Sequence, residues 1–143
     1  MANVFDTAKY ILETHGKISA MKLQKLCYYC QAWSLVWDDE PLFPENFEAW
    51  VSGPVCKELY DVTKDIFKVH AYDIHGNPDN LSDNQKNNIN IVLEHYSQRN
   101  SQWSCDLSRM EEPFILARKG LAPHELCHNI ISLADMAEYY CAL

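Results

Sequence analysis

The hydrophobic pattern of the chain is strongest between Met21 and Trp37. Apolar and small residues share one stripe of a helix there, at Leu23, Leu26, Cys27, Cys30, Ser34 and Trp37. The other side is also largely apolar, and a helix that is apolar nearly all round is normally buried in the middle of a domain. The pattern therefore predicts a central helix. Lys22, Lys25 and Gln31 should mark the narrow strip that reaches solvent.

Turn signals predict the elements on either side of this helix. An apolar stripe over residues 4–12 ends at Gly16, where a left-handed cap suits the end of a helix. Residues 47–51 alternate in part and predict a brief strand, and a second short strand is expected at 71–74 within a polar loop. Pro54 suits the first turn of the helix that follows the first strand.

The C-terminal half is predicted from helix caps. Ser82 and Gln85 form a capping box before an amphipathic segment, and Ser132 can cap a terminal helix. Residues 97–106 are mostly polar and predict a connection. Residues 111–119 begin with acids and end with bases, which matches the dipole of a short helix. The predicted fold is mainly α, a compact single-domain bundle of about six helices with one or two short β segments, over residues 1–143.

Composition and charge narrow the classes of function. The chain has 143 residues, 48% of them hydrophobic, which is enough to build one core without a metal or a disulfide. Its net charge is 12 − 20 = −8, so we do not expect direct nucleic-acid binding, and a basic protein partner fits the sign better. We expect no membrane span, because no run of about 18 apolar residues occurs. The start lacks a signal peptide and the six cysteines fall mostly in apolar helical patterns, which together predict a cytoplasmic protein with reduced thiols.

The strongest candidate for metal or redox chemistry is the pair Cys27 and Cys30. Such pairs usually lie at a turn or a helix N-terminus, whereas this pair lies in mid-helix with both thiols directed to the core. Adding His124 and His128 gives a spacing far beyond that of a zinc finger. No catalytic motif of known mechanics is present either. We therefore expect no metal, no cofactor and no enzymatic activity.

A candidate protein-binding surface follows the central helix, at Asp38, Asp39 and Glu40. Aromatic residues surround this acidic turn in the sequence, at Trp37, Phe43, Phe47 and Trp50. Acids beside aromatics would suit a basic protein partner. The alternative is a solvated loop above aromatic residues of the core.

The run from Met21 to Tyr60 also resembles a known family, the Panacea domain, which is SocA-like or GepA-like. The shared pattern is K-L-Q-K-L-x-Y-Y-x-Q-x-W, then P-L-F, then E-A-W-x-x-G-P-V and a tyrosine-bearing helix. Its most characteristic residues here are Tyr28, Tyr29, Gln31, Trp33, Trp50, Gly53 and Pro54. Weaker similarity continues into the terminal helix.

The resemblance implies an antitoxin of a toxin–antitoxin system that neutralises a co-encoded toxin by direct protein–protein binding. An alternative role that it implies is a proteolytic adaptor that delivers a toxin to the ClpXP protease. A small metal-binding protein or enzyme is the alternative from another class. For contact with the toxin, the residues themselves suggest Lys22 and Lys25 of the strip, together with Asp38, Asp39 and Glu40.

Overall fold

The computed structural model describes residues 2–143 and places seven α-helices in that range. They are α1 (Val4–His15), α2 (Ala20–Trp37), α3 (Lys57–Thr63), α4 (Asp83–Tyr96), α5 (Ser101–Met110), α6 (Glu112–Ala117) and α7 (Leu133–Cys141). The strands β1 (Ile18–Ser19) and β4 (Lys68–Val69) pair antiparallel, as do β2 (Glu48–Trp50) and β3 (Gly53–Val55). Two short 3-10 turns, η1 (Ala71–Asp73) and η2 (Pro78–Asn80), lie between β4 and α4. The mainly α prediction is confirmed.

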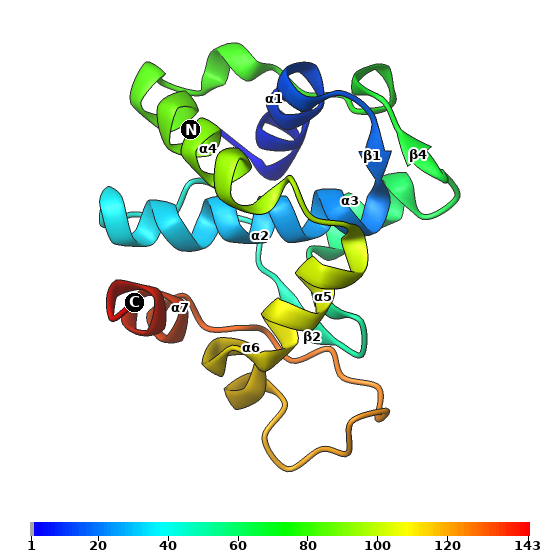
Figure 1. Ribbon diagram of the computed structural model, residues 1–143, viewed down its shortest axis with the longest axis vertical. Helices are drawn as coiled ribbons and strands as arrows, with labels where there is room; N and C mark the ends of the chain where they lie inside the picture. The colour runs from blue at the N-terminus through cyan, green and yellow to red at the C-terminus, as the bar shows by residue number, and fades with distance from the viewer. Residues whose placement is uncertain (1) are drawn as a thin grey trace.

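Helix α2 lies in the middle of the molecule, as predicted (Figure 1). Helices α1 and α4 pack on one side of it, and α7, α5 and β3 pack on the other side (Figure 1). Ser19 caps its start, because the Ser19 hydroxyl accepts a hydrogen bond from the backbone N–H of Lys22. The prediction that Lys22, Lys25 and Gln31 form a strip that reaches solvent is wrong, however. Lys25 and Gln31 are buried, and Lys22 is half-buried.

Two buried glutamines explain why α2 carries polar side chains into the core. The Gln31 amide donates to the carbonyl of Phe43 and accepts from the backbone N–H of Leu42, at 2.9 and 2.7 Å. Gln24, seven residues earlier, binds the N–H and C=O of Cys56 in the same way, at 2.8 and 3.0 Å. The backbone groups that these amides bind have no partner in a helix or sheet. Each glutamine thus satisfies them and attaches its segment to α2.

A buried carboxylate joins α2 to the C-terminal helix. Glu111 Oε1 accepts hydrogen bonds from the hydroxyls of Tyr29 and Tyr140, both at 2.7 Å. The Tyr140 hydroxyl also lies 3.3 Å from that of Tyr28. Burial raises the pKa of the Glu111 carboxyl, and the two tyrosine hydrogen bonds oppose that rise. Glu111 was expected to act only as an acid at the positive end of a helix. It is the N-cap residue of α6, but its side chain makes no capping bond and serves the core instead.

The β2–β3 hairpin corrects the prediction for Pro54. Pro54 lies within β3, opposite Ala49, and the following helix begins only at Lys57. Gly53 has a φ of 121°, and a Cβ atom there would lie 2.9 Å from Lys25 Cε. The turn therefore needs glycine for its backbone conformation and for its close approach to α2.

Two further predictions are wrong, and both concern short elements in polar segments of the sequence. The expected connection at 97–106 includes the start of α5, which Asn100 caps by accepting a hydrogen bond from the N–H of Trp103 at 2.8 Å. Where a strand was expected, at 71–74, the structure has the turn η1. A strand does lie just before this turn, namely β4, which pairs with β1. The capping box of Ser82 and Gln85, the Ser132 cap and the helix end at Gly16 are confirmed.

Candidate partner-binding groove

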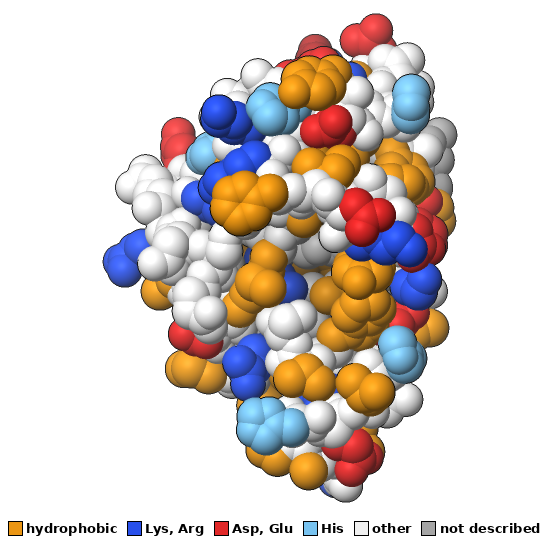
Figure 2. All heavy atoms as spheres, turned by 90° about the vertical axis from the view of Figure 1, so that its right-hand side faces the viewer, with side chains coloured by type: hydrophobic (Ala, Val, Ile, Leu, Met, Phe, Trp, Pro, Cys, Tyr) orange, Lys and Arg blue, Asp and Glu red, His pale blue; other side chains and the backbone are white. Residues whose placement is uncertain are grey.

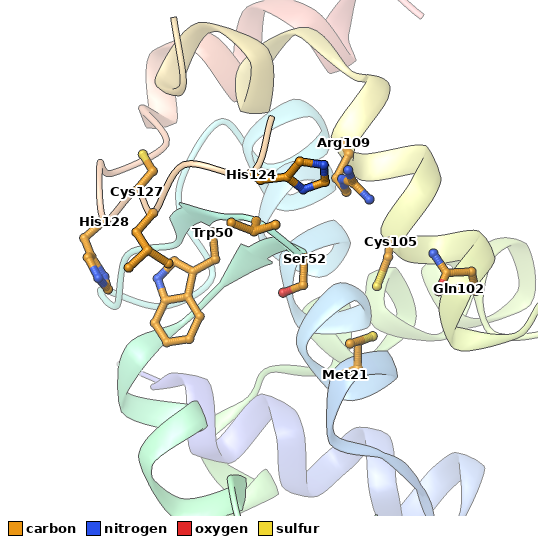
Figure 3. Close-up of a pocket in the computed structure, with 11 residues that line it drawn as sticks. Met21, Trp50, Ser52, Gln102, Cys105, Arg109, His124, Cys127 and His128 are labelled. Carbon is orange, nitrogen blue, oxygen red and sulfur yellow. The ribbon is translucent and has the colours of Figure 1, made fainter. Parts of the chain in front are cut away.

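A groove surrounds the tip of the β2–β3 hairpin. Its central hollow, about 470 Å³ in volume, is lined by residues of α2, the hairpin, α5 and the loop before α7, among them Met21, Trp50, Ser52, Arg109, His124 and Cys127 (Figure 3). A second hollow shares Val51 and Arg109 with the first and extends along α6. A third shares Met21, Trp50 and Ser52 and extends toward α3. The three hollows adjoin one another and form one continuous surface, hereafter called the hairpin groove.

Trp50 lies at the centre of the hairpin groove and is held in place by its neighbours. Its indole N–H donates to Glu48 Oε1 at 2.8 Å. Its ring meets Tyr60 edge-on, with the ring centroids 4.8 Å apart, and His128 in a similar way at 5.5 Å. The tryptophan is therefore a fixed, half-exposed apolar surface with its polar atom already satisfied.

The groove is bordered by large apolar side chains that remain in contact with solvent. Met110 is 72% exposed and Leu126 is 82% exposed. Other exposed apolar residues of the lining are Met21, Tyr60, Ile115 and Leu116. Figure 2 shows apolar side chains gathered around a hollow on this side of the molecule, with basic and histidine side chains between them. Such a collection of apolar side chains around one hollow is typical of a surface that binds another molecule.

The charge of the groove is opposite to that of the whole chain. Of the 12 Lys and Arg residues, five line its three hollows: Lys25, Lys64, Arg109, Arg118 and Lys119. Of the 20 Asp and Glu residues, one does so, Asp106, which accepts a hydrogen bond from Gln102 at 2.8 Å. The groove is thus a cationic region of a molecule whose net charge is −8.

Two of these cations have structural roles. Lys25 Nζ donates to the carbonyl of Pro54 at 2.9 Å beneath the hairpin, and burial lowers its pKa to about 8. The Arg118 guanidinium donates to the carbonyls of Ala49 at 2.8 Å and Glu125 at 2.6 Å, which attaches the loop after α6 to β2. The side chains of Arg109, Lys64 and Lys119 form no hydrogen bond or ion pair with any residue in the range 2–143. These three remain available to a ligand.

The contact residues predicted from the sequence do not form one surface. Lys22 Nζ donates to the carbonyl of Ser97, and burial together with nearby Lys68 lowers its pKa. Lys25 lies in the floor of the hairpin groove. The acidic turn lies at the other end of α2, about 20 Å away at 1.5 Å per residue.

The acidic turn itself is partly occupied by internal contacts. Asp38 accepts hydrogen bonds from the side-chain amides of Asn84 and Asn88 on α4, both at 3.0 Å. Asp39 and Glu40 are exposed, and Asp39 has a φ of 56°. Asp38 thus fastens α2 to α4, and only the carboxylates of Asp39 and Glu40 are left for a partner.

The residues of the family pattern divide between the core and the groove. Tyr28, Tyr29 and Gln31 are buried in the core, and the half-buried Trp33 donates its indole N–H to the Tyr96 hydroxyl at 3.0 Å. Trp50 lines the groove, while Gly53 and Pro54 form the hairpin above Lys25.

The cysteine pair of α2 lies deep in the core. Cys27 and Cys30 are both buried, and burial raises the pKa of each thiol. Within residues 2–143 no three His, Cys, Asp or Glu residues are grouped as metal ligands. His124 and His128 lie instead on the rim of the hairpin groove, apart from this pair (Figure 3).

Sequence reasoning missed the three groove cations whose side chains are unpaired. Arg109 was not singled out because the helix that carries it, α5, was not predicted and most of it was read as a connection. Lys64 follows the end of α3 and Lys119 follows the end of α6, and only the fold brings these two segments together. In the part of the chain that the structure describes, no helix is long and apolar enough to cross a membrane.

A model of the family described as antitoxin SocA-like, Panacea domain, matches residues 23–113. The chain belongs to this family. No curated protein and no solved structure matches the chain. The Panacea match includes most of α2, the hairpin and α5, whereas the groove wall from Arg118 to His128 lies beyond it.

Proposed function

We propose that this Panacea domain is an antitoxin that neutralises a co-encoded toxin by binding it directly. The observation that carries the proposal is the family match, which spans residues 23–113 and belongs to a family of SocA-like antitoxins. The mechanism is occlusion or clamping of the toxin, with no bond made or broken. We place the complex in the cytoplasm, without a nucleic-acid partner.

The hairpin groove supports this proposal as the surface for a protein partner. Exposed apolar residues, a fixed tryptophan and unpaired cations occur together there, and aromatic and arginine residues are enriched where proteins bind one another. The other contact surface that we propose is the acidic turn, through Asp39 and Glu40. The cationic groove would attract an acidic partner, whereas the acidic turn would attract a basic one. Reversing the charges of each surface in turn therefore shows which of them contacts the toxin.

The test is a growth-rescue assay with the product of the neighbouring open reading frame as the toxin. Expression of that protein alone should stop growth, and co-expression of this chain should restore it. Copurification of the two proteins as one complex in size-exclusion chromatography should accompany the rescue. Rescue without a stable complex, or no rescue at all, would contradict the proposal.

The same assay in a strain that lacks ClpXP distinguishes inhibition from delivery to a protease. Direct neutralisation predicts equal rescue and unchanged toxin levels in both strains. If rescue and the fall in toxin level both require ClpXP, the chain is an adaptor.

A further inference from the structure

We propose that the hairpin groove binds an acidic segment of the partner protein, in which Asp or Glu residues flank a large apolar side chain. The inference rests on the proposed function for the identity of the partner, the toxin. It adds the chemistry of the segment that is recognised and the surface that recognises it. It also reverses the expectation from net charge alone, which favoured a basic partner.

Unpaired cations indicate the acidic character of the segment. Arg109 lines two of the three hollows and has no carboxylate partner within residues 2–143. Lys64 and Lys119 stand at opposite ends of the same groove, also without partners. Outside the groove, Lys57 pairs with Asp61 at 2.7 Å. A guanidinium that is left free beside an apolar hollow suits a carboxylate, which it can bind through two parallel hydrogen bonds.

The apolar lining indicates what else the segment carries. Trp50 and Met21 face the central hollow from the hairpin and from α2 (Figure 3). Leu126, in the loop before α7, also lines it. Filling this hollow with one aromatic or branched side chain removes apolar surface from water on both partners. The carboxylates alone would gain little from exposed cations. The apolar hollow and the cations beside it together therefore define the binding segment more narrowly than either feature does alone.

The hairpin offers side chains rather than a free strand edge. On its outer side β2 already binds the loop before α7, where the Ala49 N–H donates to Asn129 O at 2.9 Å and the Ile131 N–H donates to Phe47 O at 2.8 Å. A partner strand cannot add to the sheet at that edge. Recognition through an anchoring side chain and flanking charges remains the mode that fits.

The test is a selection from a random dodecapeptide display library against the immobilised wild-type chain. Selected peptides are then made synthetically, and their affinities are measured by fluorescence anisotropy at two salt concentrations. The groove variant is Arg109→Glu with Lys119→Glu. The control variant, Lys17→Glu with Arg99→Glu, changes the net charge equally at two exposed sites outside the groove. A milder groove variant, Arg109→Gln with Lys119→Gln, serves if the reversal disturbs folding.

We expect selected peptides with two or more acids around an aromatic residue or leucine. Their affinity should fall at least tenfold for the groove reversal and by less than twofold for the control, and it should weaken as salt rises. Leu126→Ser, on an exposed side chain of the loop, should weaken binding by a smaller factor.

Several results would overturn the inference. They are the selection of basic peptides, the selection of none, and binding to the groove variant that equals the wild type. A wild-type dimer in sedimentation velocity that the groove variant dissociates would show that a second copy fills the groove instead. The proposed function fails separately. Acidic peptides bound without toxin rescue would remove the toxin as partner, and rescue without acidic peptides would remove the chemistry assigned to the groove.

Discussion

The residues of the family pattern on α2 and those on the β2–β3 hairpin are used in different ways. On α2, the polar side chains of Tyr29 and Gln31 are consumed by internal hydrogen bonds, to a buried carboxylate and to backbone groups. On the hairpin, Gly53 and Pro54 shape a turn that leaves the ring of Trp50 half-exposed in a groove. One pattern thus contains both the means of folding and a candidate surface for binding.

The difference separates two kinds of experiment. Changes in the α2 half should lower the free energy of unfolding and leave the affinity of the folded fraction unchanged. Changes around the hairpin half that keep its backbone should lower affinity and leave stability unchanged. A family motif therefore does not by itself identify a binding residue. The position of each side chain decides.

The largest expected effect on stability comes from replacing Glu111 by leucine. The hydroxyls of Tyr29 and Tyr140 would lose their acceptor in the core, at a cost of about 2–4 kcal/mol. Urea denaturation followed by circular dichroism measures this loss. Affinity for the toxin, measured on the folded fraction, should stay within twofold of the wild type. A loss of affinity in the folded protein would contradict the assignment of folding to the α2 residues and of binding to the hairpin residues.

Glu111→Gln tests the role of this buried carboxyl group through the pH dependence of stability. Glutamine keeps a carbonyl that can accept both tyrosine bonds. In the wild type the pKa of Glu111 is raised above 4.5, so the folded state holds this proton more tightly than the unfolded state does. Wild-type stability therefore falls as pH rises from about 4.5 through the raised pKa, whereas this contribution is absent in the variant. The variant should therefore gain stability relative to the wild type as the pH rises from about 4.5. A constant difference would show that Glu111 is not a buried titrating group.

Lys25, which joins α2 to the hairpin, should show a pH dependence with the opposite sign. Its pKa is lowered to about 8 from 10.5, so the folded state releases this proton before the unfolded state does. Stability from this group is lost below pH 8 and recovered as pH rises from 8 to 10.5. The stability of Lys25→Met relative to the wild type should therefore be higher at pH 7 than at pH 10, by up to about 3 kcal/mol. Paired thermal or urea melts at both pH values measure the change, and an equal difference at both would contradict it.

The acidic turn should give the smallest effect. It lies outside both halves, and Asp38 is held by Asn84 and Asn88. Asp39→Lys with Glu40→Lys spares that contact and reverses the two free charges. If the groove is the main contact, this reversal should change toxin affinity by less than about threefold, as measured by isothermal titration calorimetry. A larger loss would restore the acidic turn as the principal site.

The sequence predicted the central helix and the caps because those depend on local periodicity and on residues three apart. It failed at α5, where the polar surface of a short helix resembles a connection. It also failed at Pro54, because the hairpin depends on the close approach of Gly53 to Lys25, which are distant in the sequence.

The groove was beyond sequence reasoning for a related reason. Trp50 was singled out through the family pattern, but Arg109 lies in α5, Lys64 directly follows α3, and Lys119 lies just beyond α6. Net charge pointed to a basic partner because it averages over the surface. The local concentration of cations is visible only when the fold brings these elements to one face.

The most direct test of the account is the affinity of the purified toxin for three forms of this chain, measured by isothermal titration calorimetry. They are the wild type, Arg109→Glu with Lys119→Glu, and Lys17→Glu with Arg99→Glu, all checked for unchanged thermal melting. The account predicts that the groove reversal binds at least tenfold more weakly and that the control binds within twofold of the wild type. Equal affinity of the two double variants, or tighter binding by the groove reversal, would contradict it.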